Sequence, residues 1–327
     1  MKKHYLPLAL EQRYQIWALL NSGKNRSEIA LELGVHRSTI SRELKRNQGD
    51  NGYEPKQAEK RSQHRRRSAR KAGKRTAELE QQVVDGLRRG WSPGSISDRL
   101  KLEKDDKNQQ VSHTTIYHWI ASNKASGGCW HHYLPNQGRT RWKGGKRSRK
   151  AGASLIPDRR DISERPVEVE SRQELGHWEG DTVHGQSAHL VTLVERKSLF
   201  TLAKRVFSKT KDVVGDAMID LLETVGKALC CSMTLDNGGE FADHVRVGKA
   251  LEMAVFFARP YASWQRGTNE NTNGRIRRFW PKKFDMGTLT DEEVEQRIWH
   301  LNMTPRKKLG GLTPFEAFTG QRVALIS

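Results

Sequence analysis

The charge of this chain is distributed very unevenly along its length, and this division restricts how the chain can fold. The net charge is +20 over 327 residues, yet residues 1–150 carry +19 and residues 151–327 carry only +1. A cationic excess confined to one half is typical of a part that binds a polyanion, joined to a second part with another task. The distribution therefore predicts at least two domains, with nucleic acid as the partner of the first.

Composition narrows the class of protein further. The hydrophobic content of 35% is sufficient for folded cores, and no run approaches the roughly 20 apolar residues that cross a bilayer. The first residues lead into no apolar secretion signal, and the three cysteines form no CxxC pair. We therefore expect a cytoplasmic, nucleoid-associated protein with no membrane contact, no disulfide framework and no cysteine-rich zinc module.

Two basic runs that are poor in large apolar residues divide the chain. Residues 56–76 and 136–165 are expected to be linkers, because such runs bury too little surface to fold alone. They leave residues 1–55 and 77–135 as two helical domains, and residues 166–327 as a mixed α/β domain with C-terminal helices. The expected fold class is α+β multidomain, with N-terminal all-α helix-turn-helix modules ahead of an α/β core.

Residues 1–55 have the spacing of a helix-turn-helix unit, which follows a helix expected over Glu11–Asn21. Ala30 is small where two helices must cross, Gly34 permits a tight turn, and Ile40 buries the next helix. We expect the helix from about residue 37 to residue 45 to enter the major groove of DNA. The side chains expected to reach base edges or phosphates are Arg37, Ser38, Thr39, Ser41, Arg42 and Arg46. The alternative is a plain three-helix bundle with a polar surface.

A looser pattern of the same kind follows in residues 77–135. Ser92 is placed to cap a helix that begins at Pro93, and Ser112 is placed to cap a second helix that runs to Ile120. The connection between these two helices is longer than a tight turn permits. We expect this second unit to bind DNA as well, with Thr114 and Thr115 on its recognition helix, although a purely structural role remains the alternative.

After residue 166 short runs of β-forming residues alternate with helical periodicity. The expected elements, in order, are strands Trp178–Val183, Leu190–Glu195 and Phe200–Val206, a helix Lys211–Lys227, a strand Ser232–Leu235, a helix over 243–253, a strand Ala254–Ala258 and a helix from about Ser263 to Phe279. The order βββαβαβα is that of a ribonuclease-H-like fold, in which helices cover both faces of a mixed sheet.

This order places three carboxylates where they can meet. Asp181 lies within the first strand, Asp236 directly follows the fourth strand, and Glu270 lies on the last helix. Ligands of open α/β sheets gather at the ends of such strands. Clustered carboxylates are suitable ligands for hard divalent ions such as Mg²⁺ or Mn²⁺, and two such ions can assist displacement at a phosphodiester.

The motifs around these acids carry a resemblance that covers almost the whole chain. They are His177-Trp178-Glu179-Gly180-Asp181, Leu235-Asp236-Asn237-Gly238, residues 266–274 around Glu270, and Thr313-Pro314-Phe315-Glu316-Ala317-Phe318. Thirty-three residues separate the second and third acids, an interval characteristic of the family. With these motifs the chain resembles a DDE transposase of the insertion-sequence group called the IS-thirty family.

The resemblance implies a function and a site. Asp181, Asp236 and Glu270 would be the catalytic acids and would bind Mg²⁺ or Mn²⁺. The partner would be double-stranded DNA, both the terminal inverted repeats of the mobile element and its target. Water would cleave a strand at the element end, and the freed 3′-hydroxyl would attack the target without a covalent protein–DNA intermediate. Joining two ends requires at least a dimer on DNA.

Other readings of the same residues stay open. A non-catalytic DNA-binding regulator derived from a transposase would need only the basic half, and a retroviral-integrase-like enzyme would be expected to carry an N-terminal His/Cys zinc pattern. Glu179 shares a strand face with Asp181 and is the best internal competitor for a catalytic role. Glu240 follows Asp236 closely but lies outside the family pattern.

The last helix carries unusually many Asn and Arg residues around Glu270. Asn is a poor helix former, so we expect Asn269, Asn271 and Asn273 to make polar contacts to DNA or to the acids. Arg266 and Arg275 are expected to bind DNA. Capping and solvation of the helix surface are the alternative explanation.

Overall fold

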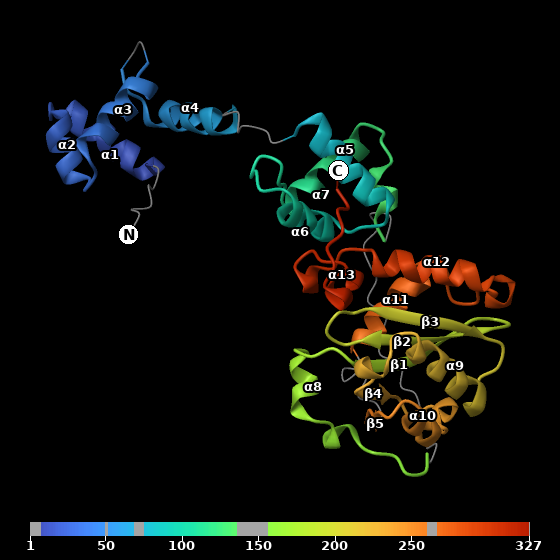
Figure 1. Cartoon of the computed structure of the whole chain (residues 1–327). Helices are drawn as coiled ribbons and strands as arrows, with labels where there is room; N and C mark the ends of the chain where they lie inside the picture. Colours follow the sequence, from blue (N-terminus) through green and yellow to red (C-terminus); the bar gives the residue numbers. More distant parts are fainter. Residues whose placement is uncertain (1–7, 50–51, 69–74, 136–155, 260–266, 327) are drawn as a thin grey trace. The chain divides into compact units, whose positions relative to one another are not determined.

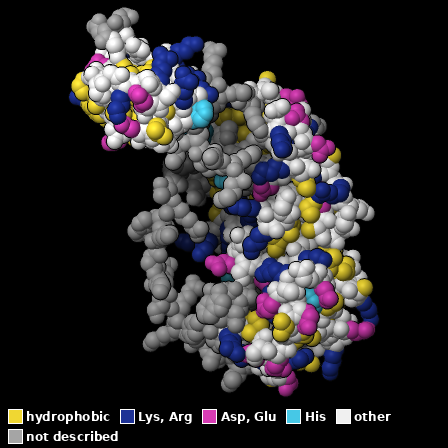
Figure 2. Space-filling model, turned by 90° about the vertical axis from the view of Figure 1, so that its left-hand side faces the viewer, with side chains coloured by type: hydrophobic (Ala, Val, Ile, Leu, Met, Phe, Trp, Pro, Cys, Tyr) yellow, Lys and Arg dark blue, Asp and Glu magenta, His cyan; other side chains and the backbone are white. Residues whose placement is uncertain are grey.

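The computed structural model describes residues 8–49, 52–68, 75–135, 156–259 and 267–326 (Figure 1). The chain divides into two compact units, Met1–Gly73 and Lys74–Ser327. Basic side chains are exposed on both units (Figure 2). Among the described residues, no helix combines the length and the apolar character that a bilayer crossing demands.

The first unit is built from four helices: α1 (Leu10–Asn21), α2 (Arg26–Glu32), α3 (Arg37–Asn47) and α4 (Pro55–Ser68). The expected helix-turn-helix is confirmed. Ala30 is buried between helices, Ile40 is completely buried, and Gly34 turns the chain with a φ of +62°. The backbone N–H of Val35 donates to the carbonyl of Ala30 across this turn (3.0 Å). Small and apolar residues at this spacing thus fix the angle at which α3 leaves α2.

The prediction of a linker over residues 56–76 is wrong for residues 56–68, which belong to α4. Arg61 donates to the carbonyls of Asn47 and Gln48 (3.0 and 3.1 Å), where α3 ends with unpaired acceptors. Glu59 forms an ion pair with the buried Arg13 of α1, and Ala58 is fully buried. Arg61, expected to lie in a linker, therefore stabilises the end of a helix. Residues 69–74 lie outside the described residues.

The second unit begins with three helices: α5 (Ala77–Arg88), α6 (Pro93–Glu103) and α7 (His113–Ala125). Both predicted caps are confirmed, since the Ser92 hydroxyl accepts from the N–H of Ser95 and the Ser112 hydroxyl accepts from the N–H of Thr115. The helices enclose their own apolar core around Leu87, Ile96 and Ile116. Leu325 and Ile326, from the other end of the same unit, pack against this core.

A buried ion pair joins this three-helix bundle to the C-terminal segment. The guanidinium of Arg99 on α6 meets both carboxylate oxygens of Glu316 on α13 (Pro314–Thr319), at 2.6 and 3.0 Å. Both side chains are about 1% exposed. Glu103 accepts from the backbone N–H groups of Leu325 and Ile326 (3.0 and 2.8 Å). The predicted boundary at residue 135 therefore does not separate two independent bodies.

The Arg99–Glu316 pair makes the stability of the second unit depend on pH at acidic values. Burial raises the pKa of Glu316, but hydrogen bonds from Arg99 and from the backbone N–H groups of Thr313 and Val323 outweigh burial and lower the pKa to about 2. A lowered folded-state pKa stabilises the fold above the ordinary carboxyl pKa, and this contribution is lost as the pH falls from about 4.5 through 2. We expect the Tm difference between the wild type and Glu316→Gln to be constant from pH 7 to 5 and to shrink below that. A difference that stayed constant down to pH 3 would contradict this assignment.

A five-stranded mixed sheet is the centre of the rest of the second unit. Its strands lie in the order β3 (Thr201–Val206), β2 (His189–Glu195), β1 (His177–His184), β4 (Ser232–Leu235), β5 (Ala254–Phe257). The first three strands are antiparallel neighbours, whereas β4 and β5 run parallel to β1. Every strand of the predicted meander and both later strands are present within two residues of the expected bounds.

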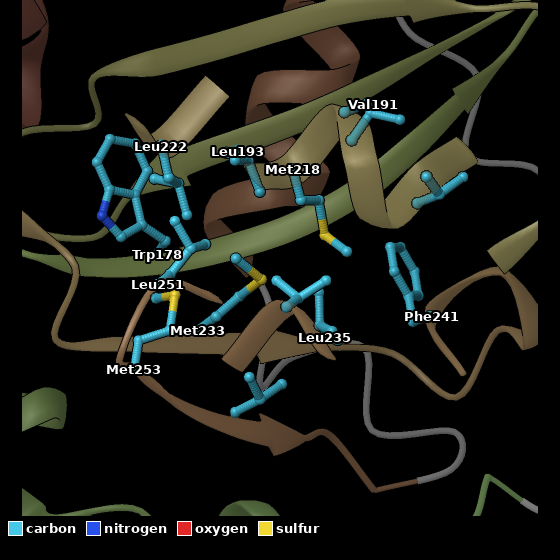
Figure 3. Close-up of a cluster of buried hydrophobic side chains, with 14 of the residues drawn as sticks. Trp178, Val191, Leu193, Met218, Leu222, Met233, Leu235, Phe241, Leu251 and Met253 are labelled. Atoms are coloured by element: carbon cyan, nitrogen blue, oxygen red, sulfur yellow. The ribbon is translucent and has the colours of Figure 1, made fainter. Parts of the chain in front are cut away.

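Helices cover both faces of this sheet, as Figure 1 shows. On one face α9 (Lys211–Glu223) and α10 (His244–Ala250) pack over Trp178, Leu193 and Met233 (Figure 3). On the other face α11 (Gly267–Phe279) and α12 (Asp291–Asn302) pack over Val183 and Leu190. Period-2 alternation along each strand divides its apolar side chains between the two cores. The predicted ribonuclease-H-like arrangement is confirmed.

The prediction of a linker over residues 136–165 is wrong for its last ten residues. Ile156 is buried in the core beneath α9, and Asp161 forms an isolated parallel bridge with Phe257 at the edge of β5. The backbone N–H of Phe257 donates to the carbonyl of Arg160 (2.9 Å). This segment continues the sheet edge, and a short α8 (Val167–Ser171) follows it. Residues 136–155 lie outside the described residues.

Candidate active site

The sheet places the first two predicted acids side by side. In the parallel pairing of β1 with β4, Glu179 lies opposite Thr234. Asp181 and Asp236 each follow that pair by two residues, so both project from the same face of neighbouring strands. This is the face covered by α11, because Val183 of β1 packs in the core with Ile276 of α11. Asp181 and Asp236 are half-buried.

Helix α11, which carries Glu270, is fastened to β1 by two asparagines. The side-chain amide of Asn269 donates to the carbonyl of Gly180 (3.2 Å), and that of Asn273 donates to Oδ2 of Asp181 (2.7 Å). Asn273 thus makes the contact to an acid that the sequence analysis expected. Glu270 is exposed and lies one helical turn before Asn273 on α11.

Both carboxylates on the strands are held by backbone groups as well. Oδ1 of Asp181 accepts from the N–H of Thr182 (2.8 Å), and Oδ1 of Asp236 accepts from the N–H of Gly238 (2.9 Å). The second bond is an Asx turn, which the sequence Asp-Asn-Gly favours. Each carboxylate is therefore oriented before any ligand arrives.

Glu179 has a structural role in this site. It is fully buried and pairs with Arg196 (2.6 Å), which is itself almost fully buried. Its second oxygen accepts from the backbone N–H of Asn269 at the start of α11 (3.3 Å). Glu179 and Arg196 therefore hold the first turn of α11 against β1. The sequence analysis missed Arg196. The available signal was the charged dipeptide Glu195-Arg196, which directly follows the β-forming residues 190–194.

Gly180 separates Glu179 from Asp181 for a steric reason. A Cβ at this position would lie 2.6 Å from a methyl carbon of Leu235 and 3.3 Å from one of Leu193. Both methyl groups belong to the core beneath α9 and α10. Only glycine at position 180 lets β1 approach β4 this closely. The residues on either side of it, Glu179 and Asp181, carry their carboxylates to the opposite face of the sheet.

Glu240, the other acid near Asp236, is engaged elsewhere. It accepts from the hydroxyl of Thr182 (3.0 Å) and lies 3.6 Å from the ammonium of Lys209. Over the described ranges, no three Asp, Glu, His or Cys side chains are close enough together to hold a metal ion. Asp181 and Asp236 share a face of the sheet and Glu270 lies on the helix that covers this face, but the three acids form no compact cluster.

Comparison with known proteins identifies the family. Residues 4–47 match a family model described as a helix-turn-helix domain. The chain is 37% identical to the transposase for insertion sequence element IS4351 of Bacteroides fragilis, over 97% of this chain and 96% of that protein. It is 34% identical to transposase InsI for insertion sequence element IS30A of Escherichia coli K12, over 96% and 84% of the two chains.

The chain belongs to the IS-thirty family of transposases. A further relative, the transposase for insertion sequence element IS1086 of Cupriavidus metallidurans, is 33% identical over 95% of this chain and 94% of that protein. Among solved structures, the catalytic core domain of BIV integrase matches 45% of this chain and 95% of its own, with 20% identity and a TM-score of 0.36. The resemblance read from the motifs is confirmed.

In this IS-thirty family member the predicted DNA-contacting residues of α3 fall into two groups. Arg37, Arg42 and Arg46 are exposed, whereas Ser38, Thr39 and Ser41 are half-buried. The hydroxyl of Ser38 is hydrogen-bonded to Nδ1 of His36 (2.8 Å), and the His36 side chain caps the helix. The exposed arginines are therefore the groups most open to a DNA backbone, and the role of all six stays a prediction.

The remaining predicted DNA contacts are spread over the second unit. Thr114 is exposed on α7, while Thr115 is half-buried and its hydroxyl is bonded to that of Ser112 (2.9 Å). Arg266 lies outside the described residues. Arg275 is half-buried on α11, and burial together with the charge of Arg278 lowers its pKa to about 10.

Proposed function

We propose that this chain binds the terminal inverted repeats of its own insertion sequence, cleaves a DNA strand at the element end, and transfers the freed 3′-hydroxyl to target DNA. One observation carries the proposal. Asp181 and Asp236 project from the same face of adjacent parallel strands, toward the helix that carries Glu270. A DNA-binding regulator would have no need for two oriented carboxylates on one sheet face under a helix that carries a third acid.

We assign Asp181, Asp236 and Glu270 as ligands of Mg²⁺ or Mn²⁺. The donor set fits such ions, because it consists of carboxylate oxygens, two from half-buried strand residues and one from an exposed helix residue. When bound, divalent ions at this site would activate the attacking oxygen and stabilise the leaving oxygen of an in-line displacement.

The chain's own residues would supply orientation and DNA affinity. Asn273 and the N–H of Thr182 hold the two oxygens of Asp181, so this carboxylate needs no reorganisation when DNA binds. The exposed arginines of α3 would contact DNA phosphates and set the register of the helix-turn-helix on the repeat. Because two element ends must be joined, the active form would be at least a dimer on double-stranded DNA.

The test is strand cleavage on plasmid DNA that carries the ends of the element. We expect nicks at the ends in Mg²⁺ or Mn²⁺, none in EDTA, and none with Asp236→Ala, although this variant still binds DNA. Tight binding by the wild type with no cleavage under conditions that pair the ends would instead favour the non-catalytic regulator.

A further inference from the structure

A small cationic pocket lies beside the catalytic helix, away from the face that carries the acids. It is a cavity of about 100 Å³, several times the roughly 10–15 Å³ that a single water needs. Its walls come from α11 and from the loop after α12, and they are lined by Leu199, Thr268, Asn271, Thr272, Arg275, Arg306, Lys307 and Lys308. Half of these lining residues are cationic, and none is acidic.

Arg306 is the central group of this pocket. It is 5% exposed, and its backbone is fixed by bonds with Leu312 and Gly311 (2.9 and 3.1 Å). Nη2 donates to the carbonyl of Leu301 (2.8 Å), but Nη1 is buried and has no hydrogen-bond partner among the described atoms. A buried guanidinium nitrogen without an acceptor is costly, so the site suits an acceptor that the described part of the chain does not supply.

Neighbouring cations increase the free-energy cost of burying the Arg306 guanidinium. Burial, together with the charges of Arg275 and Arg278, holds the pKa of Arg306 well below its usual range. Among the described residues no carboxylate raises the pKa of any of these three guanidiniums. The segments 136–155 and 260–266 contain no Asp or Glu in the sequence, so they supply no carboxylate either. Lys307 and Lys308 add two exposed cations.

We propose that this pocket binds one phosphate of the DNA backbone, on the side of α11 away from the acids. Arg306 and Arg275 would donate to the phosphate oxygens, and Lys307 and Lys308 would approach it as point charges. Arg275 follows Glu270 by five residues, about 7.5 Å along the axis of α11 and about 140° around it, so the bound phosphate and Glu270 would lie on different sides of this helix.

This inference rests on the proposed function, yet its test measures only the affinity for DNA. Affinity for a duplex that carries an element end is measured at increasing KCl without divalent ions, for the full-length wild type, Arg306→Gln and Arg275→Gln. Each lost phosphate contact is expected to lower affinity about ten- to a hundredfold at low salt and to reduce the slope of log affinity against log salt by about 0.9. Lys249→Gln, an exposed change of the same charge on α10, is the matched control and should keep the slope.

A second measurement distinguishes a pocket that binds a DNA phosphate from one that binds free inorganic phosphate. Tm is measured for each protein in inorganic phosphate and in chloride at equal ionic strength, which also reports whether each variant is folded. Reduced slopes in both arginine variants support the proposal. Unchanged slopes overturn it, and a phosphate-dependent Tm increase with unchanged slopes would assign the pocket to free phosphate instead. Because Arg275 is only half-buried, its variant tests the pocket even if Arg306→Gln fails to fold.

Loss of end cleavage by the wild type would count against the proposed function and leave these binding slopes interpretable. Conversely, normal metal-dependent cleavage with unchanged slopes would overturn the phosphate pocket alone.

Discussion

Asp181→Asn is expected to lower the rate of strand cleavage at least about 10³-fold while affinity for the element end changes less than threefold. Stabilisation of charge at a metal-assisted phosphodiester is worth several kcal/mol, and about 1.4 kcal/mol changes a rate tenfold. The amide keeps the shape of the side chain and can still meet the N–H of Thr182, but it lacks the charge that a cation requires. Cleavage and binding are measured on the same end-labelled duplex.

Asp236→Asn and Glu270→Gln should have effects of the same size, since the three acids are proposed to hold the ions together. Glu240→Gln is the matched control, because Glu240 lies four residues after Asp236 but is bonded to Thr182 and Lys209. Its cleavage rate should stay within about tenfold of the wild type. If Glu240→Gln were inactive and Asp236→Asn active, the assignment of the second acid would be wrong.

Glu316→Ala is expected to lower the stability of the second unit by about 3 kcal/mol. The change leaves Arg99 buried with one remaining carboxylate partner, Glu103, and breaking a buried pair from one side costs about 3–5 kcal/mol. For a unit of this size the loss corresponds to a Tm decrease of roughly 6–12 °C. Thermal unfolding followed by circular dichroism measures it.

The control is Asp220→Ala, which removes an exposed ion pair with Lys204 and should cost no more than about 1 kcal/mol. Limited proteolysis gives a second readout, because loss of the pair should also expose the segment around Val323 that Glu316 and Arg99 both contact. Equal Tm values for Glu316→Ala and Asp220→Ala would show that the pair contributes nothing beyond an exposed one.

Local patterns predicted most of the fold. The serine caps at Ser92 and Ser112, the turn at Gly34 and the alternation along β1 and β2 depend on residues within a few positions of each other, so the sequence alone contains the information. The same holds for the acids on the strands, since period 2 and strand order place Asp181 and Asp236 on one face.

Contacts between distant segments were not predictable in this way. Nothing near Arg61 in the sequence indicates that it caps the end of α3, and a basic run with few apolar residues looks like a linker until its partners are known. Arg196 and Arg306 were missed for the same reason, because each owes its burial to elements far along the chain. Charged residues are expected to be solvated unless a partner is visible in the sequence, and the partners of Arg61 and Arg196 lie 13 or more residues away.

The Arg99–Glu316 pair also sets an order of events during synthesis. Its two members are 217 residues apart, which corresponds to roughly 10–40 s of translation at about 5–20 residues per second. Throughout that interval Arg99 has Glu103 but lacks Glu316, and α5, α6 and α7 lack Leu325 and Ile326, which pack against their core. The nascent chain therefore completes the bundle of α5, α6 and α7 only when residues 316–326 have left the ribosome, after the five-stranded sheet has been made.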